Sequence, residues 1–190
     1  MPESSNVKNN VSVGKPKIGG AIWRAPSGTT PPTSAIATLS AAFVCMGYVS
    51  SDGFKNNNSK DHTEIKAWGG DVVAIPMTGH SDTFSGTFIE SMNTEVLKAA
   101  HGASNVTGTL DSGIAVAVNG TDDTDYVYVV DMIMNKAARK RIVIPAGMIT
   151  EVGEITYKDD DVIGYPLTIT ALPDSEENTH YEYIQKSSGT

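Results

Sequence analysis

The sequence predicts a mainly β protein, an antiparallel β-sandwich or barrel with one short flanking α-helix, a long internal loop, and extended N- and C-terminal arms. Three observations predict this class. Residues 82–90 alternate between apolar and small polar side chains, residues 126–134 are apolar on both faces, and Gly, Asn, Asp and Pro punctuate the chain between such runs. Short strands joined by turns are typical of a sandwich or barrel.

The length of 190 residues corresponds to one domain that can bury a core without disulfides or metals. We expect an N-terminal arm over residues 1–17, a sandwich domain over 18–174 and a C-terminal arm over 175–190. Both arms are polar and lack a core pattern. The C-terminal arm also contains three apolar anchors, predicted to dock on its own subunit or on a neighbour: Tyr181, Tyr183 and Ile184.

The first part of the domain holds one strand and two less regular segments. Residues 18–24 predict a strand that ends at the turn sequence AlaProSerGly. Residues 35–46 fit a short helix or an extended loop, because apolar side chains recur at helical spacing between Gly and β-branched residues. Tyr48 and Val49 begin another strand. Residues 50–61 are polar and too numerous for a tight hairpin, so they predict a long loop.

A hairpin and a half-buried strand follow. Residues 63–68 and 71–75 flank Gly69-Gly70, whose glycines suit a tight turn between two strands. In residues 82–90 the aromatic side chains point to one face, and Thr83, Ser85 and Thr87 point to the other. The pattern predicts one buried face and one small, polar face.

One helix is predicted over residues 94–101. Asn93 is a favourable N-cap, Glu95 lies in the first turn, Lys98 and His101 lie near the end, and Gly102 follows as a terminator. The rest predicts strands at residues 114–118, 126–134, 140–144, 149–157 and 163–172, with breaks at 119–120, 145–147 and 158–161. Because residues 126–134 are apolar on both faces, they must be covered on both sides, by the helix, the arms or another subunit.

Charge and cysteine content exclude several classes of protein. With 14 basic and 22 acidic side chains the net charge is −8, so the surface repels nucleic acid phosphates and anionic lipid, although solubility alone also explains the charge. Cys45 is the single cysteine and predicts no disulfide. No signal peptide or long apolar run is present, so we expect synthesis in the cytoplasm and no membrane partner.

The sequence predicts no catalytic, cofactor-binding or metal site, and therefore no enzyme. The four histidines lack ligand spacing, and the acidic turns at 122–125 and 159–161 lack the glycine and distal glutamate of a calcium loop. Nucleophile elbows and phosphate-binding loops are missing as well. Cys45 sits among apolar residues, which favours a buried, inert thiol.

Seven stretches, in order along nearly the whole chain, resemble the major tail tube proteins of bacteriophages with long non-contractile tails. They are GKPKIGGAIWRAP from Gly14, GYVSSDG from Gly47, IKAWGGD from Ile65, RIVIPAG from Arg141, TEVGEITYKDD from Thr150, IGYPLTITALPD from Ile163 and NTHYEYI from Asn178. The resemblance implies a sandwich that closes into rings of six, which stack into a hollow tail tube through which the genome passes.

The same resemblance implies partners and a location. The subunit would be made in the host bacterial cytoplasm, reside in the virion tail, and contact other tail proteins such as the tape measure and terminator proteins. Genomic DNA would pass through the lumen without specific binding. Two sets of residues are then candidates for assembly. The lumen candidates are Thr83, Ser85, Thr87, Glu154 and Thr156, and the inter-subunit loop candidates are Asp52, Phe54, Lys55, Asn57 and Lys60.

Other functions stay open at this level. A monomeric β-sandwich binding module, for instance for carbohydrate, should show clustered aromatic residues, whereas Trp23 and Trp68 are isolated in sequence. A tube protein of a related contractile or secretion system is a further alternative. An enzyme on a β scaffold is the weakest, because no acid, base or nucleophile constellation is present.

Overall fold

The structure, a computed structural model, describes residues 6–121, 124–135 and 138–186. Its elements follow one another along the chain as η1 (Lys8–Asn10), β1 (Lys15–Pro16), β2 (Ile22–Pro26), β3 (Val44–Cys45), β4 (Lys55–His62), β5 (Ile65–Lys66), β6 (Val72–Ala74), β7 (Met77–Phe88), α1 (Thr94–His101), η2 (Ala103–Asn105), β8 (Val106–Thr107), β9 (Ala115–Val116), β10 (Tyr126–Ile133), β11 (Ala138–Val152), β12 (Tyr165–Ala171) and β13 (Tyr181–Lys186). The predicted mainly β, antiparallel class is confirmed.

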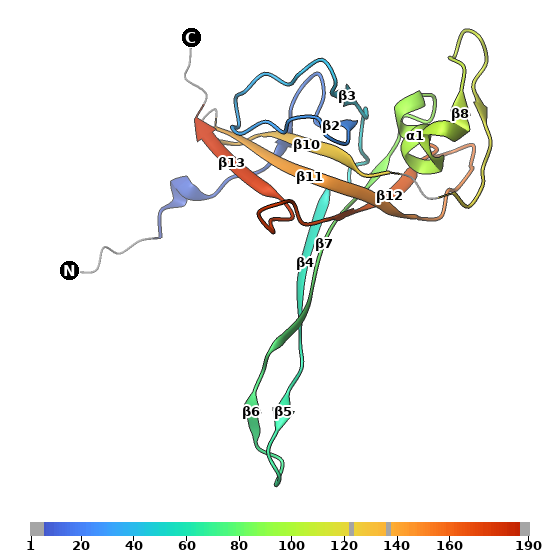
Figure 1. The fold of residues 1–190 in the computed structure, drawn as a ribbon. Helices are drawn as coiled ribbons and strands as arrows, with labels where there is room; N and C mark the ends of the chain where they lie inside the picture. The colour runs from blue at the N-terminus through green and yellow to red at the C-terminus, as the bar shows by residue number, and fades with distance from the viewer. Residues whose placement is uncertain (1–5, 122–123, 136–137, 187–190) are drawn as a thin grey trace.

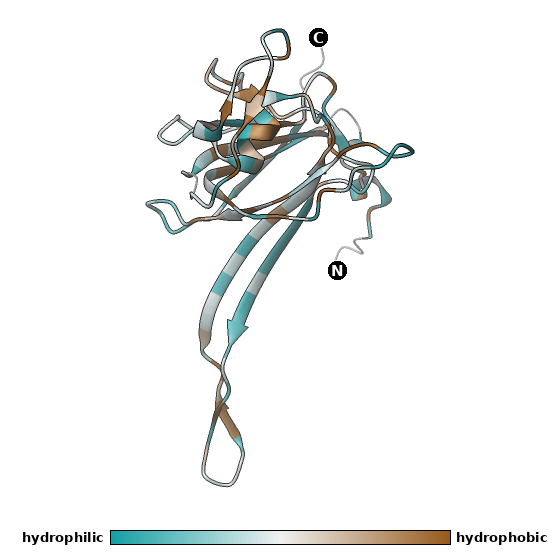
Figure 2. Ribbon diagram, turned by 90° about the vertical axis from the view of Figure 1, so that its right-hand side faces the viewer, coloured by the Kyte–Doolittle hydropathy of each residue, from teal (hydrophilic) through white to brown (hydrophobic). Residues whose placement is uncertain are grey.

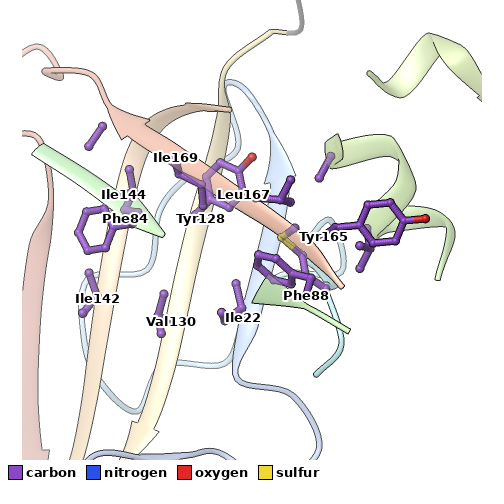
Figure 3. Close-up of a cluster of buried hydrophobic side chains, with 14 of the residues drawn as sticks. Ile22, Phe84, Phe88, Tyr128, Val130, Ile142, Ile144, Tyr165, Leu167 and Ile169 are labelled. Atoms are coloured by element: carbon purple, nitrogen blue, oxygen red, sulfur yellow. The ribbon is translucent and has the colours of Figure 1, made fainter. Parts of the chain in front are cut away.

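Nine strands form the main sheet in the order β3-β2-β10-β11-β12-β7-β4, with β1 beside β10 and β13 beside β11 (Figure 1). All its ladders are antiparallel. Ile22 on β2 and Phe88 on β7 belong to one buried cluster, although three strands separate β2 from β7 in the sheet (Figure 3). The sheet therefore curls over this core and gives the protein a sandwich-like arrangement.

Strand β10 is covered on both faces, as its double apolar pattern requires. Tyr128 and Val130 pack into the large core cluster, whereas Val127 and Val129 pack on the opposite face. The second cover consists of side chains from the chain between β2 and β3 and from β13, namely Leu39, Phe43, Tyr181 and Tyr183. The cover on this second face of β10 therefore comes from the same chain, from the loop between β2 and β3 and from the C-terminal arm.

Helix α1 has the predicted bounds. The side chain of Asn93 accepts a hydrogen bond from the Glu95 backbone N–H at 2.9 Å, and the Gly102 N–H closes the last turn. Glu95 also receives bonds from Arg24 on β2 at 3.1 Å and from Lys98 at 2.7 Å. Burial alone would raise the pKa of Glu95, but these two cations outweigh burial and lower it. The helix is thereby fixed to the sheet by charge as well as by apolar packing.

Strands β4 and β7 form a long hairpin that leaves the body of the protein, with β5 and β6 at its tip (Figure 1). The predicted turn at Gly69-Gly70 is present, but it also includes Trp68, and the two strands beside it are shorter than the predicted 63–68 and 71–75. The prediction of a loop over residues 50–61 is wrong for its second half, because Lys55–His62 is a strand. Its Lys and Asn side chains have low β propensity, yet a continuous ladder to β7 supplies the backbone partners.

Strand β11 is continuous, so the predicted break at residues 145–147 is wrong. Pro145 lies between the end of the β13 ladder at Val143 and the start of the β12 ladder at Gly147. On the other side, the pairing with β10 shifts register at the same place. Proline removes a donor that no partner strand requires there, so the strand passes through it. The strands predicted at 140–144 and 149–157 are therefore parts of one strand, which ends at Val152.

Other boundaries differ by a few residues. The strand predicted at 18–24 begins at Ile22, because Gly19 and Gly20 take positive φ values of 84° and 135° and form a turn. Residues 35–46 adopt the loop alternative, ending in the short strand β3. The strands expected at 114–118, 126–134 and 163–172 are present with narrower limits.

Both arms contact the sheet. In the N-terminal arm, β1 pairs with the end of β10, and Asn135 donates hydrogen bonds to Ser12 and to the Val11 carbonyl. In the C-terminal arm, β13 pairs with the first half of β11. Residues 1–5 and 187–190 of the arms, and Asp122 and Asp123 of the first acidic turn, lie outside the described residues. Within the described part of the chain, no helix is long and apolar enough to cross a membrane.

Candidate functional site

The sheet has a face covered only in part. On β7, Thr83, Ser85 and Thr87 point away from buried Phe84 and Phe88, and all three are half-buried. Their partners on β12 are Thr170, Thr168 and Pro166 in that order. Together these six residues form what we call the polar sheet face. Small side chains, five of the six with a hydroxyl group, thus line one side of two neighbouring strands whose other side builds the core.

The polar sheet face continues onto the flanking strands. Lys55 and Asn57 of β4 lie opposite Ser85 and Thr83, and Glu151 of β11 lies opposite Thr168. A shallow depression of roughly 210 Å³ is lined by Lys55, Ser85, Thr168 and Glu151 among others. Its lining mixes both charge signs, so the depression favours neither an anion nor a cation strongly.

Two lumen candidates lie outside the polar sheet face. Glu154 and Thr156 are exposed in the chain that follows β11, after the ladder has ended at Val152. Glu151 is the acidic residue that the register places beside the β12 threonines. The bulge between Ile149 and Glu151 reverses the alternation along this strand, so Glu151 lies beside the polar sheet face.

The tip of the projecting hairpin is strongly apolar (Figure 2). We define the tip as residues 64–77. Trp68 is fully exposed, and the other large apolar side chains of the tip are about half exposed: Ile65, Val72, Val73, Ile75 and Met77. Two strands without a covering layer cannot bury these groups. Glu64 and Asp71 give the tip an acidic character that Lys66 offsets only in part.

A groove of roughly 300 Å³ lies between the chain at 36–43 and strands β2 and β11. Its lining combines apolar and basic side chains: Lys17, Trp23, Ile36, Leu39, Phe43, Arg139 and Arg141, with Ala37, Thr38 and Ser40 between them. Buried Arg141 fixes the groove wall, because it donates to the carbonyls of Ser34 and Ala37 at 3.0 and 2.7 Å.

The charge of Arg141 is matched inside the protein. Asp131 accepts from Arg141 at 2.6 and 2.9 Å, and Lys17 approaches the same carboxylate at 3.3 Å. Arg139, by contrast, makes no ion pair with any residue that the structure describes. Within the described residues, the groove therefore offers one cation without an ion-pair partner, Arg139, beside apolar side chains.

A buried carboxylate fixes the C-terminal arm at the base of the hairpin. Asp82 of β7 accepts hydrogen bonds from Asn56 of β4 at 2.8 Å, from Thr179 at 2.6 Å and from His180 at 2.5 Å. Burial alone would raise the pKa of Asp82, but the bonds from Thr179, Asn56 and His180 outweigh burial and lower it. The His180 ring also packs edge-on against Phe84.

The inter-subunit loop candidates occupy different environments. Asp52 lies in an exposed turn, whereas half-buried Phe54 packs against Phe84 and Phe88 in its own core. The remaining three, Lys55, Asn57 and Lys60, are exposed on β4. Of the arm anchors, Tyr181 and Tyr183 pack on the second cluster and stack on each other, while Ile184 stays exposed. Among the described residues, no three His, Cys, Asp or Glu side chains gather as metal ligands would.

Two features of the structure go beyond the sequence-based predictions. Trp68 is isolated from other aromatic residues in the sequence, but the apolar residues on both sides of Gly69-Gly70 mark an uncovered hairpin. Asp82 shares a face with Phe84 and Phe88, and an acidic residue in that alternation was the available sign of a buried, bonded carboxylate.

Comparisons with known proteins were made on both sequence and structure. A family model described as phage tail tube protein matches residues 8–189. A search of curated proteins returned no match. Among solved structures, one match is a chain from the virion of a native gene transfer agent particle. It is 8% identical, with a TM-score of 0.42, over 89% of this chain and 98% of that chain.

Proposed function

Because this chain belongs to the phage tail tube protein family, we propose that its copies close into rings of six that stack into the hollow tube of a long, non-contractile tail. Family membership makes it a structural protein of the virion tail. The ring number, the stacking and the conduit for DNA ejection are the proposed part. No catalytic step is assigned to the chain, since its role is mechanical and arises from assembly.

The observation that carries the proposal is the polar sheet face. It is a broad surface of small, mostly polar side chains. The rest of the sheet is covered by the helix, the loop at 27–43 and the C-terminal arm. Placed toward a lumen, its hydroxyl groups offer DNA no cluster of cations, and the net charge of −8 repels phosphates. Passing DNA would then bind only weakly, as a conduit requires.

The hairpin supports the polymeric part of the proposal. A two-stranded extension with exposed apolar groups at its tip is unfavourable for a monomer, and a neighbouring copy provides the cover it lacks. Lys55, Asn57 and Lys60 lie on the first strand of this hairpin. They would contact the copy that covers the tip, or another neighbouring copy. The tape measure protein inside the tube, the terminator at its end, and DNA without specific binding complete the proposed partners.

The direct test is the state of the purified protein. Size-exclusion chromatography with light scattering, followed by negative-stain electron microscopy, should show rings or hollow filaments whose share rises with concentration. A protein that stays monomeric at every concentration would contradict the proposal and favour the binding-module alternative.

The lumen assignment has its own test. Replacing Ser85 and Thr168 by Lys places two cations on the polar sheet face while leaving the core untouched. Tubes should form normally, and DNA release from particles should slow at low salt and recover as salt is raised, because phosphate attraction is screened. The control replaces Asp159 and Asp160 by Asn, which changes net charge equally in an exposed turn. Equal slowing in both variants would place the polar sheet face outside the lumen.

A further inference from the structure

We propose that the hairpin tip of one copy docks into the groove of a second copy, with Trp68 seated on the apolar floor and Asp71 facing Arg139. This inference rests on the proposed function, since it names the partner surface that joins tube subunits. The complex formed is head-to-tail: one copy contributes its tip, and its neighbour contributes its groove. Such an interface does not close on itself and extends a stack without limit.

Position is the first argument. The hairpin leaves the body on one side, whereas the chain between β2 and β3, which forms the groove wall, lies on the opposite side of the body (Figure 1). A tip that reaches away from the body cannot enter its own groove. In a stack of copies that share one orientation, however, the tip of each copy points toward the groove side of the next.

Size and polarity are the second argument. Trp68 is the largest exposed side chain of the tip, and it carries one N–H donor on an otherwise apolar ring. The groove combines Trp23, Leu39 and Phe43 with the backbone of the chain at 36–40. Its volume of roughly 300 Å³ accommodates an aromatic side chain. Buried aromatic anchors in such pockets are the residues that dominate protein interfaces.

Charge is the third argument. The Asp71 side chain makes no hydrogen bond or ion pair with any other described residue, although its backbone closes the tip turn through the Ala67 N–H at 2.8 Å. Arg139 at the groove likewise makes no ion pair within the described residues. Docking would pair the free carboxylate of Asp71 with the free guanidinium of Arg139. Such a pair determines how the tip is oriented in the groove and adds little to the binding free energy.

The test uses two full-length variants that each lack one half of the contact. Trp68→Ala removes the anchor and keeps the groove. Ile36→Glu keeps the tip and places a carboxylate in the groove lining, at a side chain 40% exposed in its own fold. Thr38→Trp, which fills the groove from an exposed position, serves as the second groove variant if Ile36→Glu does not fold. Tyr48→Ala, which removes another strongly exposed aromatic ring, is the matched control.

Trp68→Ala and the groove variant should each assemble poorly alone, with the concentration needed for tube formation raised about thirtyfold or more. Mixed together, they should associate through the one intact pairing and stop there, giving paired rings or dimers rather than tubes. Tyr48→Ala should assemble like the wild type. Full tube formation by Trp68→Ala, no association in the mixture, or an equal defect in Tyr48→Ala would overturn the docking inference.

Failure of the two proposals looks different in this experiment. If the wild type forms neither rings nor tubes, the proposed function itself is wrong. If the wild type forms tubes and the two variants form them equally well, the tail tube role stands and only the pairing of tip with groove is wrong.

Discussion

Replacing Asp82 by Ala should destabilise the subunit and loosen its C-terminal arm first. The Asp82 side chain is buried and accepts hydrogen bonds from Asn56, Thr179 and His180. A hydrogen bond to a charged group contributes about 1.5–3 kcal/mol, and Asn56 can turn to water when its partner is lost, so we expect a loss of about 2–4 kcal/mol. Thr179 and His180 precede β13 directly, so the loss falls mainly on this strand.

Urea unfolding of the dissociated subunit measures the total loss, and hydrogen exchange locates it. In Asp82→Ala the amides of β13 should exchange faster than those of β10, whereas Asp160→Ala, in an exposed turn, should leave both unchanged. Asp82→Asn keeps the size but loses the charge, and should fall between the two. A loss below about 1 kcal/mol in Asp82→Ala, or equal exchange throughout the sheet, would refute the role of Asp82 in holding the arm.

The same residue predicts a pH dependence. Because the folded-state pKa of Asp82 lies below its unfolded value, its stabilisation is fully present above the unfolded pKa and is lost as pH falls through the folded pKa. Urea midpoints of the wild type should therefore drop below about pH 4, and the drop should be smaller in Asp82→Ala. An identical drop in both proteins would assign acid sensitivity to other carboxylates.

Two further substitutions test the core and the groove wall. Gly147→Ala would place a Cβ 2.8 Å from Tyr128 and 2.9 Å from Ile169. Thermal unfolding should therefore show a free energy of unfolding lower by about 1–3 kcal/mol. Gly120→Ala, with open space around it, should show little change. Arg141→Ala leaves Asp131 buried with only Lys17 beside it and should lower the free energy of unfolding in urea by about 3 kcal/mol. Lys140→Ala, at the part-exposed pair with Glu182, should lower it by less than about 1 kcal/mol. Equal losses would contradict the distinction between buried and surface pairs.

Local signals in the sequence predicted what depends on local physics. The helix at 94–101 is fixed by its own caps, and the turn at Gly69-Gly70 by backbone freedom, so both appear as expected. The strand at 126–133 was recognisable because a double apolar pattern has few other interpretations. Polar alternation on β7 likewise marked Thr83, Ser85 and Thr87 as one face.

Pairing over long distances could not be predicted in the same way. Lys55–His62 is a strand only because β7 lies beside it, and its composition alone favours a loop. Pro145 is tolerated because the partners of β11 change there, which depends on where β12 and β13 begin and end. The groove needs the loop at 36–43, β2 and β11 brought together, and no sequence spacing records that contact.

Electron cryomicroscopy of the assembled protein tests the central claim most directly. A helical reconstruction should show six copies in each ring, with Thr83, Ser85 and Thr87 facing the lumen and each hairpin reaching a copy in the adjacent ring. Particles without a lumen, or a tube with these three residues on its outer wall, would contradict the account.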